Sequence, residues 1–331
     1  MPDVPQRDRA RALAEHDLNA ALCGALPPAA MEEIRVSRCP GCGAELELGE
    51  GVAATACPFC ATPVVPQEAP LRAIRPQALL PFAVSEREAR AAMVAWLGRL
   101  WFAPGGLQDY ARKGRQLTGI YVPFWTFDAA TRSRYAGQRG DAYYETRWVT
   151  VEVNGRQERR QEQVRKIRWS PVRGWVSRRF DDVLVIGSDS LPRGHTEALA
   201  PWDLSGLQPH APDYLSGFQA EAYSVPLEQG HALAREEMAA VIASDVRRDI
   251  GGDEQRIDRI DTDWSDETFK HILLPVWTAA YKYGGKSYRF VVNGQTGKVK
   301  GERPWSVWKI AVAVVLGLAV AGALAWLGQQ R

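Results

Sequence analysis

The sequence predicts an α+β protein with an N-terminal zinc ribbon, two related modules of antiparallel sheet plus helix, and a single C-terminal transmembrane helix. Three observations predict this class. Two Cys-x-x-Cys pairs lie near the N-terminus, a strand, helix and Pro-x-Trp strand occur in that order twice, and an apolar stretch lies near the C-terminus. With 331 residues, 24% charged and 46% hydrophobic, the chain is neither disordered nor fibrous.

Four cysteines predict a structural zinc site: Cys39 and Cys42 in CPGCG, and Cys57 and Cys60 in CPFC. A Cys-x-x-Cys knuckle places two thiolates on one tight turn, and two knuckles complete the tetrahedral coordination of Zn²⁺. No position is then left for a catalytic water. The N-terminal residues carry charges throughout and lack an apolar signal-peptide core, so we expect reduced thiols. The fifth cysteine, Cys23, has no assigned role.

The N-terminal part divides into three segments. We expect a helix within residues 1–35, the ribbon over 36–65, and a proline-rich linker with a first strand over 66–81. Within the ribbon, AELEL and VAATA should pair as a hairpin around Gly49-Glu50-Gly51. Residues 39–60 contain three glutamates and no Lys or Arg, which favours a protein partner over a phosphate backbone.

The body contains a weak internal repeat, which predicts one module over 82–180 and a second over 181–303. Each copy has an Ala-Arg-x-x-Met helix (89–93 and 234–238) followed by a Pro-x-Trp strand (123–125 and 275–277). The second helix, over 229–249, should end at Gly251. Alternating apolar residues on either side of Asn293-Gly294 predict a final hairpin.

A basic block lies over residues 129–180, with 13 Arg or Lys against five acidic residues. Alternation at 150–153 and the Asn154-Gly155 turn predict a long exposed hairpin. The block could be a solvated face, or it could bind anionic lipid or nucleic acid. A nearby membrane anchor would favour lipid, because each basic residue close to an anionic surface contributes about 1 kcal/mol.

The apolar stretch Ile310–Leu327 predicts a transmembrane helix over 305–328. Tryptophans near its ends and basic residues before it place the N-terminal bulk in the cytoplasm of a single-pass protein of the inner (cytoplasmic) membrane. Small residues at four-residue spacing would allow self-association through this helix; they are Ala313, Gly317, Ala321 and Ala325.

No catalytic pattern is recognised, and we expect no enzyme activity. Gly285-Lys286-Ser287 resembles the end of a phosphate-binding loop, but Ala280 stands where its first glycine should be. The patterns G-x-S-x-G and H-E-x-x-H do not occur.

Several motifs together resemble a bacterial family of membrane-anchored zinc-ribbon proteins; they are CPGCG…CPFC, YVPFWTFDA, RRDIGGD, LLPVWTAAYKYGGKSYRFVVNGQTG and GERPWSVWKI. Members are often labelled primosomal protein N′ (replication factor Y), superfamily II helicase, or TFIIB-type zinc-ribbon protein. The resemblance implies a zinc-binding membrane anchor, with related proteins serving envelope-stress machinery of the phage-shock type. The helicase label does not transfer, because this chain lacks the nucleotide-binding motif.

These observations favour a non-enzymatic, tail-anchored docking or scaffold protein that faces the cytoplasm, contacts membrane lipid and binds a protein partner. The alternative is a nucleic-acid-binding protein that uses the hairpin 129–180.

Overall fold

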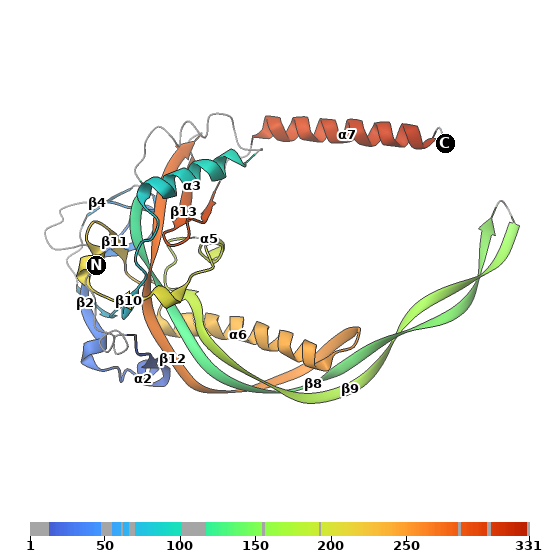
Figure 1. Cartoon of the computed structure of the whole chain (residues 1–331), viewed down its shortest axis with the longest axis horizontal. Coiled ribbons are helices and arrows are strands. Elements are labelled where there is room, and N and C mark those ends of the chain that lie inside the picture. Colours follow the sequence, from blue (N-terminus) through green and yellow to red (C-terminus); the bar gives the residue numbers. More distant parts are fainter. Residues whose placement is uncertain are drawn as a thin grey trace.

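The computed structural model describes residues 13–47, 55–60, 62–65, 70–100, 117–153, 156–191, 193–283, 286–302 and 306–329. Most strands belong to one mixed sheet of 12 strands. Figure 1 shows a body at the left, from which a long, twisted two-stranded arm and one helix extend.

Four strands form the centre of the sheet in the order β9–β8–β12–β13, all antiparallel. Their bounds are β8 (Thr118–Val153), β9 (Arg156–Ile186), β12 (Glu254–Tyr283) and β13 (Lys286–Asn293). The strands β8 and β9 pair from Phe124↔Ile186 to Val153↔Arg156, which confirms the predicted long hairpin. The strand β12 follows β8 only as far as Gly140, so the outer arm has two strands.

Short strands complete the sheet on both sides of this centre. Beside β12 lie β7 (Ala78–Leu79), β10 (Gln208–Pro209) and β1 (His16–Asp17), and β14 (Val299–Gly301) pairs with β13 as predicted. Beside β8 lie β11 (Gln219–Glu221), β3 (Glu45–Glu47), β2 (Met31–Arg38) and β6 (Pro70–Ile74). The strands β4 (Thr55–Ala56) and β5 (Pro63–Val64) form a separate pair.

Two long helices cover one face of the central strands. They are α3 (Glu86–Gly98), which begins with a capping box of Ser85 and Glu88, and α6 (Leu227–Ile250), which ends at Gly251 with φ 64° as predicted. A glycine suits this position because it adopts positive φ without steric cost. The remaining helices are α2 (Leu18–Leu22), α5 (Arg193–Glu197), α7 (Val307–Gln329) and the 3₁₀ turns η1 (Pro28–Ala30), η2 (Leu204–Gly206) and η3 (Pro212–Leu215).

Each repeat helix packs on the Pro-x-Trp strand of the other copy. In one cluster, α6 residues Ala234 and Met238 pack with Trp125 of β8. In another, α3 residues Ala89 and Met93 pack with Trp277 of β12. The repeat therefore describes two halves that exchange their helices.

Two equivalent hydrogen-bond networks fix this exchange. The indole of Trp125 donates to the carbonyl of Val225, just before α6, at 3.0 Å. The indole of Trp277 donates to the carbonyl of Val84, just before α3, at 2.8 Å.

The backbone around each tryptophan repeats the match. The amide of Gly187 donates to the carbonyl of Pro123, and the carbonyl of Gly187 accepts from the residues just before α6. In the same way, the amide of Gly294 donates to the carbonyl of Pro275, and the carbonyl of Gly294 accepts from the residues just before α3.

These contacts correct the predicted fold class. The chain is mostly β, and the two predicted sheet-plus-helix modules are not separate, because their strands β8 and β12 pair directly in one sheet. Local sequence patterns predict single strands and helices, but they do not determine which strand lies beside which.

The predicted transmembrane helix is also wrong. Residues Val307–Gln329 form α7, yet among the described residues no helix has the length and apolar character that crossing a bilayer requires. The tail-anchored function and the membrane location depended on this helix and are contradicted with it.

We predict that Trp125→Phe and Trp277→Phe each lower the free energy of unfolding by about 1–3 kcal/mol, because each leaves a valine carbonyl without its donor. Urea unfolding measures the effect. Trp175→Phe is the control, because Trp175 is 52% exposed and should change stability by less than about 0.5 kcal/mol. If either substitution at a buried tryptophan left the free energy of unfolding unchanged, the exchange of helices between the two halves would be contradicted.

Candidate functional site: a four-cysteine centre and a basic arm

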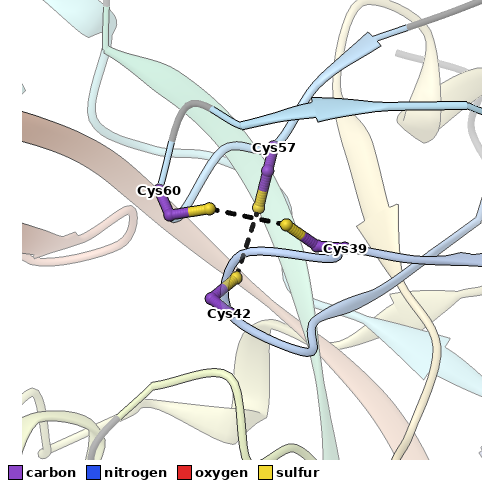
Figure 2. Close-up of side chains that lie close together, drawn as sticks. All are labelled: Cys39, Cys42, Cys57 and Cys60. Carbon is purple, nitrogen blue, oxygen red and sulfur yellow. Dashed lines mark hydrogen bonds between the residues drawn. The ribbon is translucent and has the colours of Figure 1, made fainter.

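The four predicted ligands meet at one point. Cys39 and Cys42 lie on the turn after β2, and Cys57 and Cys60 lie on the turn between β4 and β5. Figure 2 shows their side chains converging from these two loops. The four sulfur atoms lie within 4.8 Å of one another, and this cluster could hold a metal ion.

Backbone hydrogen bonds shape both knuckles. The Cys39 amide donates to the carbonyl of Ala44, and the Cys57 amide donates to that of Thr62, both at 2.8 Å. Gly43, with φ 79°, closes the first turn in a conformation that favours glycine. At Gly41, a Cβ atom would lie 2.4 Å from the Thr62 hydroxyl, so the two knuckles approach too closely for a side chain there.

The sulfur atoms approach as two crossed pairs. The Sγ atoms of Cys39 and Cys60 are 3.4 Å apart, and those of Cys42 and Cys57 are 3.6 Å apart. Tetrahedral coordination with metal–sulfur bonds of about 2.3 Å requires sulfur separations of about 3.8 Å, close to these distances.

Protonation within the cluster is uneven. A hydrogen bond from the Cys57 thiol lowers the pKa of Cys42 to about 5, and the same contact raises the pKa of Cys57. Burial raises the pKa of Cys39. A thiolate therefore lies among three further sulfur atoms, which suits a thiophilic cation.

The cysteine centre packs against the face of the sheet opposite α3 and α6. Cys39, Cys57 and Phe59 belong to one buried cluster with Ile120 and Ile272 of the central strands. The hairpin predicted between AELEL and VAATA is not formed by their described residues: β3 pairs with β2 and β11, and β4 pairs with β5. The ribbon is thus part of the main sheet's packing.

A buried carboxyl group lies beside this region. Glu221 of β11 is 1% exposed and accepts hydrogen bonds from the hydroxyls of Ser188, at 2.6 Å, and Ser190. Burial raises the pKa of Glu221 to about 8. No sequence pattern indicates this group, because Glu221 lies more than 30 residues from the two serines and meets them only in the folded chain.

The arm has two chemically different faces, because successive strand residues point to opposite sides. On one face α6 covers Tyr135, whose hydroxyl donates to Asp249 at 2.6 Å, and Arg178, which pairs with Asp245. Farther out, the same face pairs Arg139 with Asp141. Both of these arginines therefore have a carboxylate partner.

The opposite face carries a concentration of arginines, which we name the arginine face. The register of β12, β8 and β9 places eight there: Arg132, Arg134, Arg159, Arg165, Arg173, Arg179, Arg256 and Arg259. Among the residues whose side chains are described, three carboxylates share this face in regular register: Glu254, Asp261 and Asp263. Six of the arginines belong to the predicted basic block, whereas Arg256 and Arg259 come from β12 and could not be assigned to it from sequence.

We predict that the purified chain carries one equivalent of tightly bound metal and that Cys57→Ser removes most of it, because one thiolate ligand is lost. Elemental analysis measures the ratio. Cys23→Ser is the matched control, because Cys23 is exposed and outside the cluster. Equal metal content in all three proteins would contradict the assignment.

We predict that Glu221→Gln reduces the loss of stability on going from about pH 5 to about pH 8. The carboxyl binds its proton more tightly in the folded chain, where its pKa is about 8, than in the unfolded chain near 4.5. Stability therefore falls as pH rises through this window, by an amount of order a few kcal/mol at ~1.4 kcal/mol per pKa unit.

Urea unfolding at both pH values tests this, with exposed Glu236→Gln as control. Parallel pH dependence in wild type and the Glu221 variant would show that Glu221 does not titrate in this way.

Comparison with known proteins adds one relative. No protein-family model matches the chain, and no solved structure is significantly similar to it. The chain is 27% identical over 243 residues to a Bacillus subtilis (strain 168) protein described as "Uncharacterized protein YdjG". The alignment covers 72% of this chain and 66% of the Bacillus protein, so the chain spans just under two thirds of its relative. That description names no activity, and the zinc-ribbon family resemblance stays a prediction.

Proposed function

We propose that the chain is a non-enzymatic binding protein that holds a structural zinc ion and uses its arm to bind an anionic polymer. The observation that carries the proposal is the arginine face, where the described side chains include eight arginines and three carboxylates on one side of an extended arm.

Zinc is the metal that suits the centre best. Four thiolates in tetrahedral arrangement select zinc or iron among common metals, and zinc needs no redox partner. With all four positions taken by cysteine, the ion has no site for water or substrate and acts by closing the two knuckles against the sheet. Elemental analysis of the purified chain distinguishes zinc from iron.

The centre and the arm depend on the same strand. Ile120 and Phe124 of β8 pack in the cluster that contains Cys39 and Cys57, and β8 then continues into the arm. We therefore assign the metal a supporting role, in which it fixes the body from which the arm projects.

Electrostatics favour the arm as the contact surface. Unbalanced cationic charge along an extended surface attracts polyanions, and binding releases their counterions. The expected protein contact at the acidic ribbon has less support, because Glu47 is partly buried and burial raises its pKa to about 7. The preference for lipid over nucleic acid rested on the predicted membrane anchor. Because that anchor is contradicted, the preference no longer holds.

We predict that the chain binds heparin-agarose and that Arg173→Glu with Arg259→Glu elutes at clearly lower salt, because the pair reverses two charges on the arginine face. The matched control is Lys166→Glu with Arg168→Glu, which makes the same change in net charge on the opposite face of the arm.

The control should elute close to wild type, and circular dichroism should show that both variants are folded. Equal effects of the two double variants, or no retention of the wild type, would contradict the proposed contact surface.

A further inference from the structure

We propose that the polymer is single-stranded nucleic acid, with its phosphates along the arginine face and its bases stacked on the aromatic side chains of that face. This inference rests on the proposed function of the arm and specifies its ligand.

A groove on the arginine face supplies the first observation. An open hollow of about 470 Å³ is lined by Arg134, Arg173, Trp175, Arg259 and Asp261 and by adjoining backbone. Asp261 contacts both Arg134, at 3.8 Å, and Arg259, at 2.8 Å, so one carboxylate is shared by two guanidinium groups. With Arg173, the groove keeps an excess of positive charge beside an indole ring.

Trp175 has the exposure and the neighbours of a stacking platform. It is 52% exposed, although a tryptophan that served only packing would be covered. The guanidinium carbons of Arg132 and Arg134 lie 4.7 and 5.7 Å from its ring centroid. A base stacked on this ring would therefore have cationic groups close to its phosphates.

The platform is repeated toward the tip of the arm. Trp169, with Arg256 4.0 Å above its ring, lies on the same face and opposite Gly140. Farther out are Tyr144, 64% exposed, and Trp148, 57% exposed. In strand register, these four rings follow one another at intervals of about 13–20 Å, at ~3.3 Å per residue. The face is thus an extended row of rings interleaved with arginines.

This combination distinguishes single strands from other polyanions. In a duplex the base faces are stacked on one another, so a duplex can use the arginines but not the exposed rings. Sulfated polysaccharides and lipid headgroups likewise offer charge without planar faces. Aromatic platforms beside a cationic track are the general means by which proteins bind single strands without sequence preference.

Fluorescence anisotropy of the full chain tests the inference. The probes are a labelled thymidine oligonucleotide long enough to span the arm, a duplex of equal length, labelled heparin, and phosphatidylcholine vesicles containing phosphatidylglycerol, the last in a flotation assay. We expect the single strand to bind more tightly than the duplex at equal salt.

The diagnostic variant is Trp148→Ala with Trp175→Ala. Because two rings are lost, it should weaken single-strand binding by roughly 30-fold or more and leave heparin binding nearly unchanged. Tyr143→Ala, an aromatic truncation on the opposite face, is the matched control. Thermal unfolding confirms that each variant is folded.

The outcomes separate the two proposals. Equal affinity for duplex and single strand, with no effect of the tryptophan variant, would overturn this inference and leave the polyanion function standing. Binding to vesicles but not to oligonucleotides would overturn it in favour of lipid. Absence of salt-dependent binding to any of these probes would overturn both.

Discussion

The antiparallel pairing of β8 with β12 is the constraint on which the rest of the structure depends. These two strands form the middle of the sheet, and the elements on both faces of the sheet pack against them. The cysteine centre packs on one face of the pair, and α3 and α6 pack on the other. The arm is the continuation of the same strands beyond the body (Figure 1). Trp125 and Trp277 make this pairing specific, because each ties its strand to the segment that precedes the other half's helix.

This arrangement explains why a metal centre and a distant charged surface belong to one protein. A long hairpin alone is marginally stable, because it has few contacts to offset the entropy of ordering its chain. Here its base is held by β12, by α6 and by the core that contains Cys39 and Cys57. The body therefore holds the base of the arm, while the arginine face of the arm remains exposed. Binding on that face needs no pocket in the body and no chemistry at the metal.

Local features were predictable from the sequence, and pairing between distant segments was not. The spacing of the four cysteines predicts their convergence because each knuckle spans only four residues. Gly251 predicts the end of α6 for the same local reason, and Asn154-Gly155 predicts a hairpin although the turn itself lies outside the described residues. The repeat predicts similar halves, but only the structure shows that they exchange helices. Likewise, β3 pairs with β11 and not with β4, and Arg256 joins Arg132 on one face through the register of β12. The apolar composition of 310–327 suggested a membrane span that the described helix does not provide.

Photocrosslinking of the complex tests the central claim, that the arginine face is the contact surface. The intact chain would be irradiated with a single-stranded oligonucleotide, and the crosslinked peptides would be identified by mass spectrometry. The account predicts crosslinks at Trp175, Trp169, Tyr144 or Trp148, all on one face of the arm. Crosslinks concentrated at Tyr143 on the opposite face, or in the body around the cysteine centre, would contradict it.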